Sequence, residues 1–291
     1  MSTATAKRES LIIGMLAETF IHPGVGQANS AIDLPVARER VTDYPFIPGS
    51  GVKGAFKSWA EEQAGMDKKT EIPVLFGVAE GAGTLLFSDA RLLLLPVRSL
   101  NAAYIWLTCP LLIERFARDT NRGGASISLN PGTANPVDGS YLGKAHTPLV
   151  LEEREFICGG NVPDQVLTAL SALLPAGPKE RLGAQLAIVS NIDFNWFAKY
   201  ALHVAAHNAL TDKKTSSALW YEETLPPDTV MYCLLAERSA GSVCKLRGKI
   251  AGPNKYCQFG GNETVGQGWF QLTLPKFASA APAASEVIAH A

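Results

Sequence analysis

The feature that most constrains the fold is an alternation of short apolar runs with segments of helical spacing. Strand-like runs are found at 10–20, 84–96, 103–107, 217–224, 229–236 and 269–274, and helical patterns at 52–64, 109–118, 163–174 and 194–210. The order begins β-α-β and repeats with insertions, which predicts an open α+β sandwich of the ferredoxin-like kind. A chain of 291 residues, 47% of them hydrophobic, is long enough for one elaborated domain or two small ones.

Two segments break this alternation. From Asp119 to about Leu149 the chain is rich in Gly, Pro, Asn and Ser and has little to place in a core. A span of this length without a pattern is usually functional or disordered, and we predict a protruding arm of β-hairpin form. Residues 278–291 are rich in Ala, Ser and Pro, which predicts a flexible tail.

The composition limits the classes of partner. The net charge is −1, so no global basic field drives binding to nucleic acid and any such contact must use local patches. Five cysteines without a CxxC pair are typical of a reduced, cytoplasmic protein with buried thiols. The apolar run 11–17 is too short to span a bilayer, and Glu9 and Glu18 bracket it, so we expect no membrane contact.

A glycine-rich turn at Pro48–Gly54 (PGSGVKG) opens directly onto the helix predicted at 52–64. Backbone amides at the start of a helix suit a phosphate, and Lys53 and Lys57 are one helical turn apart on the same face. The alternative is a plain helix start with Ser50 as the N-cap. The two lysines favour the phosphate, although the spacing of a P-loop is absent.

A second glycine-rich loop spans Gly260–Gly268 (GGNETVGQG). Gly261 and Gly266 have Walker spacing, but Gln267 and Gly268 replace the lysine and the hydroxyl residue, and a strand follows instead of a helix. These departures argue against nucleotide hydrolysis. A backbone surface against a nucleic-acid strand and a plain wide turn both remain.

Basic residues alternate in the segment Lys245–Lys249 (KLRGK), which on a strand projects Lys245, Arg247 and Lys249 from one face. Such a run is usually a solvated face. Beside the glycine loop, and with Lys255 following, it could instead form a groove for a single-stranded backbone, and we favour the groove.

Two histidines, His203 and His207, lie at i, i+4 on the helix predicted at 194–210. This spacing suits a metal ion, but the glutamate of a zincin is absent and no third ligand is evident. An exposed polar stripe is the favoured interpretation.

Asp33 and His22 are the candidates for chemistry. An aspartate beside a proline most often forms a turn, but a carboxylate can also hold Mg²⁺ or orient a ribose 2′-hydroxyl for attack on the adjacent phosphate. His22 is either a general acid or base or a ring that anchors its loop. Both residues lie in the stretch that leads to the glycine turn.

Several motifs, in order along the chain, resemble those of the RAMP superfamily, and within it the backbone subunits of type III-B (Cmr) CRISPR effector complexes. They are HPGVGQ…IDLPVARE…YPFIPGSGVKG, DARLLLLPVRSL, LTCPLLIERFARD, LWYEETLPPDT and FGGNETVGQGW, and the resemblance spans about Leu11 to Leu274. It implies one domain over 1–277 with an RRM-like palm and a protruding thumb, which we place at about 119–150. It also implies a filament of copies along a CRISPR guide RNA, other Cmr subunits as partners, and divalent-metal-dependent cleavage of target RNA with Mg²⁺ or Mn²⁺.

The resemblance also implies roles for individual residues. By motif position Asp33 supports catalysis and binds the metal, and His22 falls on the family's histidine in the same loop. The predicted RNA contacts are Arg38, Gly49, Ser50, Gly51, Lys53, Lys57, Lys245, Arg247, Lys249, Lys255, Gly260, Gly261 and Gly266. Gly51 and Val52 replace the more usual serine and leucine of the turn motif. The family also contains non-catalytic filament proteins, and the presence of Asp33 favours the nuclease.

Overall fold

The computed structural model describes residues 9–28, 31–121, 127–136, 148–253 and 255–276. The predicted tail at 278–291 lies outside these residues. The helices are α1 (Gly49–Glu62), α2 (Glu71–Phe76), α3 (Pro110–Asp119), α4 (Asp164–Ser171), α5 (Ala176–Gln185), α6 (Asn191–Tyr200) and α7 (Ser242–Ile250). The strands are β1 (Ser10–Ala17), β2 (Phe46–Ile47), β3 (Gly77–Val78), β4 (Gly81–Ala82), β5 (Leu85–Phe87), β6 (Ala90–Arg98), β7 (Tyr104–Thr108), β8 (Thr133–Pro136), β9 (Leu149–Leu151), β10 (Arg154–Cys158), β11 (Leu186–Val189), β12 (His203–Leu210), β13 (Ser216–Thr224), β14 (Val230–Glu237), β15 (Tyr256–Gln258) and β16 (Trp269–Thr273).

One large mixed sheet carries the fold, in the order β15-β16-β1-β14-β6-β7-β11-β8-β10-β9. Its centre is antiparallel, with β1 between β14 and β16, while β7 and β11 run parallel. The central strands β1 and β6 are buried along most of their length, which explains their nearly continuous apolar sequences. The predicted strands at 10–20 and 84–96 are thereby confirmed.

Helix α1 packs on the sheet with the apolar face that the sequence predicts. Val52, Phe56 and Trp59 are buried, and the Phe56 ring lies 5.4 Å from the rings of Phe87 and Phe259. Helix α3 starts at Pro110, as predicted, because proline lacks only an N–H that the first helical turn leaves unpaired.

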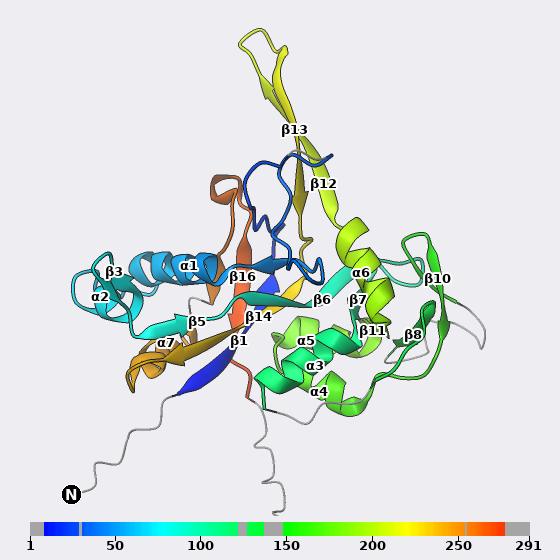
Figure 1. Ribbon diagram of the computed structural model, residues 1–291, viewed down its shortest axis with the longest axis horizontal. Coiled ribbons are helices and arrows are strands. Elements are labelled where there is room, and N and C mark those ends of the chain that lie inside the picture. Colours follow the sequence, from blue (N-terminus) through cyan, green and yellow to red (C-terminus); the bar gives the residue numbers. More distant parts are fainter. Residues whose placement is uncertain (1–8, 29–30, 122–126, 137–147, 254, 277–291) are drawn as a thin grey trace, which may run out of the picture.

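The hairpin β12–β13 forms its own two-stranded sheet and projects away from the rest of the molecule (Figure 1). This corrects the helix predicted at 194–210, since α6 ends at Tyr200 and β12 begins at His203. This alanine-rich stretch has a helical propensity, but cross-strand pairing with β13 outweighs it. Within that pairing, His207 stacks on Trp220 with ring centroids 5.5 Å apart. The two histidines therefore share one face of a strand.

The expectation of a projecting hairpin is confirmed in kind by β12–β13, and the thumb predicted at about 119–150 stays a prediction. Within the predicted arm, residues 122–126 and 137–147 lie outside the described residues, and β8 belongs to the main sheet between β11 and β10. The hairpin β12–β13 lies more than fifty residues later. Its sequence is that of ordinary strands, so composition did not single it out.

The strand predicted at Lys245–Lys249 is also wrong, because these residues lie in helix α7. Its turns bury Val243, Leu246 and Ile250 at helical spacing, and this apolar spacing decides the element. On a helix, Lys245, Arg247 and Lys249 no longer share one face.

The five cysteine thiols differ in burial. Cys109, Cys233 and Cys257 are buried and Cys158 and Cys244 are exposed, so the prediction of buried thiols holds for three of the five. Burial raises the pKa of the Cys233 thiol to about 12, which keeps it protonated. In the described part of the chain no helix is long and apolar enough to cross a membrane.

Candidate functional site at the base of the hairpin

Three segments that are distant in sequence meet where the hairpin leaves the sheet. The loop after β1 pairs with the base of β13 through bridges from Ile21 to Leu225 and from Leu34 to Glu222. The glycine loop joins from the other side, since its Gly261 N–H donates to the carbonyl of His22 (2.9 Å). We call the cluster of His22, Asp33, Glu222 and Asn262 the hairpin-base site.

Asp33 is held by one oxygen and open at the other. The Tyr221 amide N–H donates to Asp33 Oδ2 (2.8 Å), and the next amide, of Leu34, donates to the Tyr221 carbonyl (3.0 Å). Among the described residues nothing donates to Asp33 Oδ1, and the side chain is partly exposed. The turn-forming and the functional interpretations of the sequence are therefore compatible, because the carboxylate has one oxygen for each.

His22 is 8% exposed, and its Nδ1 lies 2.8 Å from the carbonyl oxygen of Glu223. A carbonyl only accepts, so in the neutral ring this contact places the proton on Nδ1 and the lone pair on Nε2. Nε2 faces Gly24, where an ideal Cβ would lie only 2.5 Å away. A glycine at position 24 therefore leaves room for the imidazole ring. His22 anchors its loop through Nδ1, and its predicted role as a general acid or base stays a prediction.

Glu222 and Asn262 complete the site, and the sequence did not point to either. Glu222 is buried, its Oε1 lies 3.9 Å from His22 Nδ1, and it accepts a hydrogen bond from Asn262 Nδ2. Asn262 adopts a left-handed backbone conformation that aims its side chain at the hairpin. The available signal was a pair of acids in an otherwise uncharged strand, which is uncommon for residues that become buried.

Arg38 has a structural role in place of the predicted RNA contact. Its Nη2 lies 2.6 Å from Oε1 of the buried Glu223, and its Nη1 donates to the carbonyls of Asp43 and Ala198 (2.8 Å each). A buried carboxylate requires such a partner, and this requirement turns the guanidinium inward. The pair fixes the loop after β1 against β13.

The glycines of the 260–268 loop differ in function. Gly260 has φ +86°, and an ideal Cβ there would lie 2.6 Å from the His22 carbonyl oxygen. Gly266 has φ +81° with open space around it. Gly260 is thus required for close packing against the histidine loop, whereas Gly266 only shapes the turn. The predicted RNA contacts of both residues and of Gly261 remain predictions.

These two glycines offer a matched test of the packing. Gly266→Ala and Gly260→Ala both place alanine at positive φ, at a cost of about 1–2 kcal/mol each. Only Gly260→Ala also displaces His22, so we expect it to lower the free energy of unfolding by at least ~1 kcal/mol more than Gly266→Ala. Urea unfolding monitored by tryptophan fluorescence measures the difference. Equal losses would mean that the loop does not hold the histidine.

A second candidate region is a groove of about 600 Å³ beside α1, lined on one side by Ser50, Lys53 and Lys57. The opposite wall is the β3–β4 turn, which contributes Glu80. The prediction that the two lysines share one face of a helix is confirmed. Two ammonium groups along one groove suit a chain of phosphates, each acting as a point charge.

The start of α1 differs from the predicted helix start with Ser50 as the N-cap. The N-cap is Pro48 and no side chain caps the helix, so Ser50 is not the cap. The Gly49 N–H donates to Asp89 Oδ1 (2.6 Å), so the Asp89 carboxylate already uses one of the free backbone amides at the N-terminus of the helix. The predicted phosphate contacts of Gly49, Ser50 and Gly51 must therefore use the remaining amides, and Lys53 and Lys57 become the main determinants of this region.

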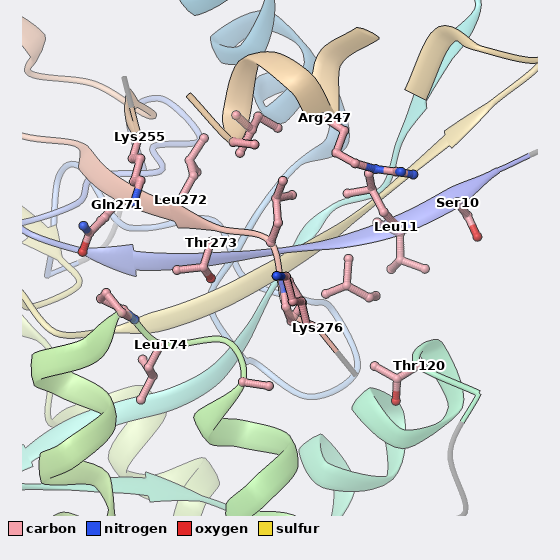
Figure 2. Close-up of a pocket in the computed structure, with 18 of the residues that line it drawn as sticks. Ser10, Leu11, Thr120, Leu174, Arg247, Lys255, Gln271, Leu272, Thr273 and Lys276 are labelled. Atoms are coloured by element: carbon pink, nitrogen blue, oxygen red, sulfur yellow. The ribbon is translucent and has the colours of Figure 1, made fainter. Parts of the chain in front are cut away.

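A cavity of about 1190 Å³ contains part of the predicted basic groove but not the hairpin-base site. Figure 2 shows Arg247 and Lys255 on different parts of its rim. Arg247 pairs with Glu9, directly before β1, whereas the glycine loop bonds to Phe20 and His22, after β1. Strand β1 separates the two regions, so α7 does not extend the glycine loop into one groove. The predicted RNA contacts of Lys245, Arg247, Lys249 and Lys255 depended on a shared groove with the glycine loop, and the structure does not form that groove.

Metal ligation was considered for the whole described part of the chain. Residues 9–28, 31–121, 127–136, 148–253 and 255–276 contain no group of three or more His, Cys, Asp or Glu placed to hold a metal ion. Asp33 Oδ1 is a single carboxylate oxygen of the kind that Mg²⁺ uses together with substrate phosphates. His203 and His207 belong to no such group among these residues.

Comparison with known proteins gives consistent results over most of the chain. A family model described as the RAMP superfamily matches residues 15–271. The CRISPR system Cmr endoribonuclease Cmr4 of Pyrococcus furiosus is 30% identical over 285 residues, covering 91% of this chain and 96% of the relative. The crystal structure of oligomeric Cmr4 from Pyrococcus furiosus superposes with a TM-score of 0.74 at 26% identity, covering 94% of this chain and 100% of that one. A cryo-EM structure of type III-B Cmr-beta bound to cognate target RNA has a TM-score of 0.70 at 21% identity, covers 91% of this chain and 96% of that one, and supports the fold alone.

Proposed function

Because the chain belongs to the RAMP superfamily, we propose that it is the RNA-cleaving backbone subunit of a type III-B CRISPR effector complex. Copies would assemble along a guide RNA with other Cmr subunits, and each copy would cut the paired target RNA. The α+β palm with a projecting hairpin, expected from the sequence, is the fold of the related Cmr4 structures. The similarity to a protein named an endoribonuclease, over nearly its full length, supports the activity.

The catalytic assignment depends mainly on how the carboxylate of Asp33 is hydrogen-bonded. One oxygen is fixed by the Tyr221 amide and the other has no protein partner among the described residues. A carboxylate that is oriented at one end and open at the other is preorganised to act on a substrate.

Cleavage proceeds in this proposal by attack of a ribose 2′-hydroxyl on the adjacent phosphate. Asp33 orients the hydroxyl and takes its proton while the O2′–P bond forms and the P–O5′ bond breaks. His22 Nε2, when protonated, supplies the proton that the departing 5′-oxygen needs. The products are a 2′,3′-cyclic phosphate and a 5′-hydroxyl.

The donor set fits a divalent ion, Mg²⁺ or Mn²⁺, that the protein and the RNA bind together. The protein alone would not hold this ion permanently. Asp33 would hold it together with phosphate oxygens of the RNA, as one carboxylate is enough when the substrate supplies the rest. The bound ion would neutralise charge on the phosphate. Glu222 remains beside His22, with its Oε1 3.9 Å from His22 Nδ1.

The metal requirement gives a direct prediction. Chelation by EDTA is expected to lower target cleavage by the assembled complex by at least ~100-fold, and excess Mg²⁺ or Mn²⁺ should restore it, because charge neutralisation at the phosphate is lost. The readout is gel electrophoresis of labelled target RNA, with guide binding measured in parallel as the control. Undiminished cleavage in EDTA would restrict the mechanism to protein groups.

The alternative is a non-catalytic filament subunit that only binds the guide. Lys53 and Lys57 would serve both functions equally, since they line a groove suited to phosphates. The open oxygen of Asp33 favours the nuclease. Substitution of Asp33 in a complex that still binds target RNA separates the two functions.

A further inference from the structure

The start of strand β1 has a partner strand on one side only. Strand β1 pairs with β14 over residues 10–16 but with β16 only over residues 14–17. Strand β16 ends at Thr273, and Pro275 follows, which has no N–H to continue the ladder. Figure 2 shows β1 continuing past Thr273 toward Ser10, beyond the end of β16. Among the described residues, 10–13 therefore pair with β14 alone, and we call them the β1 edge.

The free backbone groups of the β1 edge face a cavity. The Leu272 N–H donates to the Lys255 carbonyl (2.7 Å), away from β1, so the next residue, Thr273, faces β1, where it pairs with Gly14. Backbone groups alternate in direction along an antiparallel strand, so Ile12 faces the same side as Gly14. On that side the Ile12 N–H and C=O have no partner among the described residues. The lining of the cavity of about 1190 Å³ includes Ile12, and such an edge is a template for another strand.

Apolar side chains border the β1 edge on both faces of the sheet. Leu272 pairs with Met15, and Leu11 lies four residues before Met15 on the same strand, so Leu11 and Leu272 share one face. Ile12 pairs with Leu234, and these two share the opposite face. All four leucine and isoleucine side chains line the cavity. A strand added at this edge would direct alternate side chains to the two faces, so apolar β-branched residues fit at successive positions.

The charges of the cavity favour an acidic partner. Its two acids, Glu9 and Asp119, are each in an ion pair with an arginine. Its two lysines, Lys255 and Lys276, have no ion-pair partner among the described residues. An excess of two unpaired positive charges attracts a segment with negative charges and repels one with positive charges.

We propose that an extended acidic segment of another protein adds as a strand to the β1 edge. Its backbone pairs with the free N–H and C=O of Ile12, its apolar side chains pack on the two faces of the sheet, and its acidic flanks meet Lys255 and Lys276. This is recognition by β-strand addition, in which backbone hydrogen bonds supply affinity and side chains supply specificity. The β1 edge lies at the opposite end of β1 from the hairpin-base site, so this contact is independent of the proposed RNA cleavage.

A labelled peptide tests the charge preference on the full chain. The peptide EEVTVIVEE, with both ends blocked and a fluorescein label, has an apolar centre and acidic flanks. Its control is KKVTVIVKK, which differs only at the charged positions. We expect fluorescence anisotropy to show at least ~tenfold tighter binding of the acidic peptide, because Lys255 and Lys276 attract it. Reversal of both charges, as Lys255→Glu with Lys276→Glu, should reverse this preference.

Two further measurements show whether binding uses the backbone. Ile12→Pro removes the free N–H and leaves the hydrogen bonds to β14 in place, so it should weaken binding of the acidic peptide by at least ~tenfold. Ile12→Ala keeps the N–H and is the matched control. N-methylation of the central residues VTVIV removes the donors of the peptide and should weaken binding to the unmodified chain as much, a result that does not depend on the folding of Ile12→Pro.

The outcomes separate this occupant from the others. Equal binding of the two peptides, or undiminished binding after loss of the backbone donors, would overturn the proposal. Binding that appears only after residues 277–291 are removed would assign the β1 edge to the chain's own end. Binding that appears only when self-associated chains are diluted would assign it to a second copy. Either assignment would also overturn the proposal, and the proposed cleavage of target RNA would stand in each case.

Discussion

Replacing Asp33 by asparagine is expected to reduce target-RNA cleavage by at least ~100-fold, the range typical of losing a general base. The amide oxygen of asparagine can still accept the Tyr221 N–H that now binds Asp33 Oδ2 at 2.8 Å, so the loop keeps its position. Only the negative charge and the basic oxygen are lost. Single-turnover cleavage of labelled target by the assembled complex gives the rate, and filter binding gives the affinities for guide and target, which should remain nearly unchanged.

Two further variants show whether the effect is chemical. Asp33→Ala should be at least as slow as Asp33→Asn, because it also frees the Tyr221 amide. Asp164→Ala, at an exposed aspartate in the first turn of α4, should cleave like the unmodified protein. Cleavage by Asp33→Asn at the unmodified rate would exclude Asp33 as the catalytic base.

The second large effect is expected at the groove beside α1. Lys53→Glu combined with Lys57→Glu should weaken guide binding by at least ~tenfold, since two phosphate contacts become repulsive. Each phosphate contact contributes about 0.7 to the slope of log affinity against log salt concentration for a single strand, so the slope should fall by about 1.4. Titrations of guide RNA at several salt concentrations measure both quantities.

The matched control is Lys68→Glu with Lys69→Glu, which changes the net charge equally at an exposed loop outside the groove. Lys245→Glu with Lys249→Glu, on α7, is expected to have a smaller effect than the α1 pair, because neither lysine lines the groove beside α1. If all three pairs weaken binding to the same extent, the effect is general electrostatics and the groove has no special role.

The parts of the fold that the sequence predicts are those set by local patterns. The buried run of β1, the apolar face of α1 and Pro110 at the start of α3 follow from spacing and from proline chemistry alone. Helix α7 and strand β12 were assigned to the wrong class because each depends on a partner. In α7 the alternating basic residues suggested a strand, but Leu246 and Ile250 are buried in the core at helical spacing. Strand β12 forms because β13 pairs with it.

The site was predictable in part for the same reason. Asp33 and His22 are close in sequence and in a motif, so a resemblance was sufficient to select them. Glu222 and Asn262 are brought to His22 by tertiary contacts across about 200 residues, and no spacing rule links them. Arg38 looked free in the sequence, but the buried carboxylate of Glu223 binds it.

The central claim is that target RNA is cut at the hairpin-base site, and one structure tests it most directly. The assembled complex of the Asp33→Asn variant, with guide and an intact target, would retain the reactive 2′-hydroxyl in place. We predict that the side-chain amide nitrogen of the asparagine at position 33, which takes the place of Asp33 Oδ1, lies within about 2.6–3.2 Å of that hydroxyl, or is linked to it through one water. A separation too large for either contact, with the target fully paired to the guide, would contradict the account.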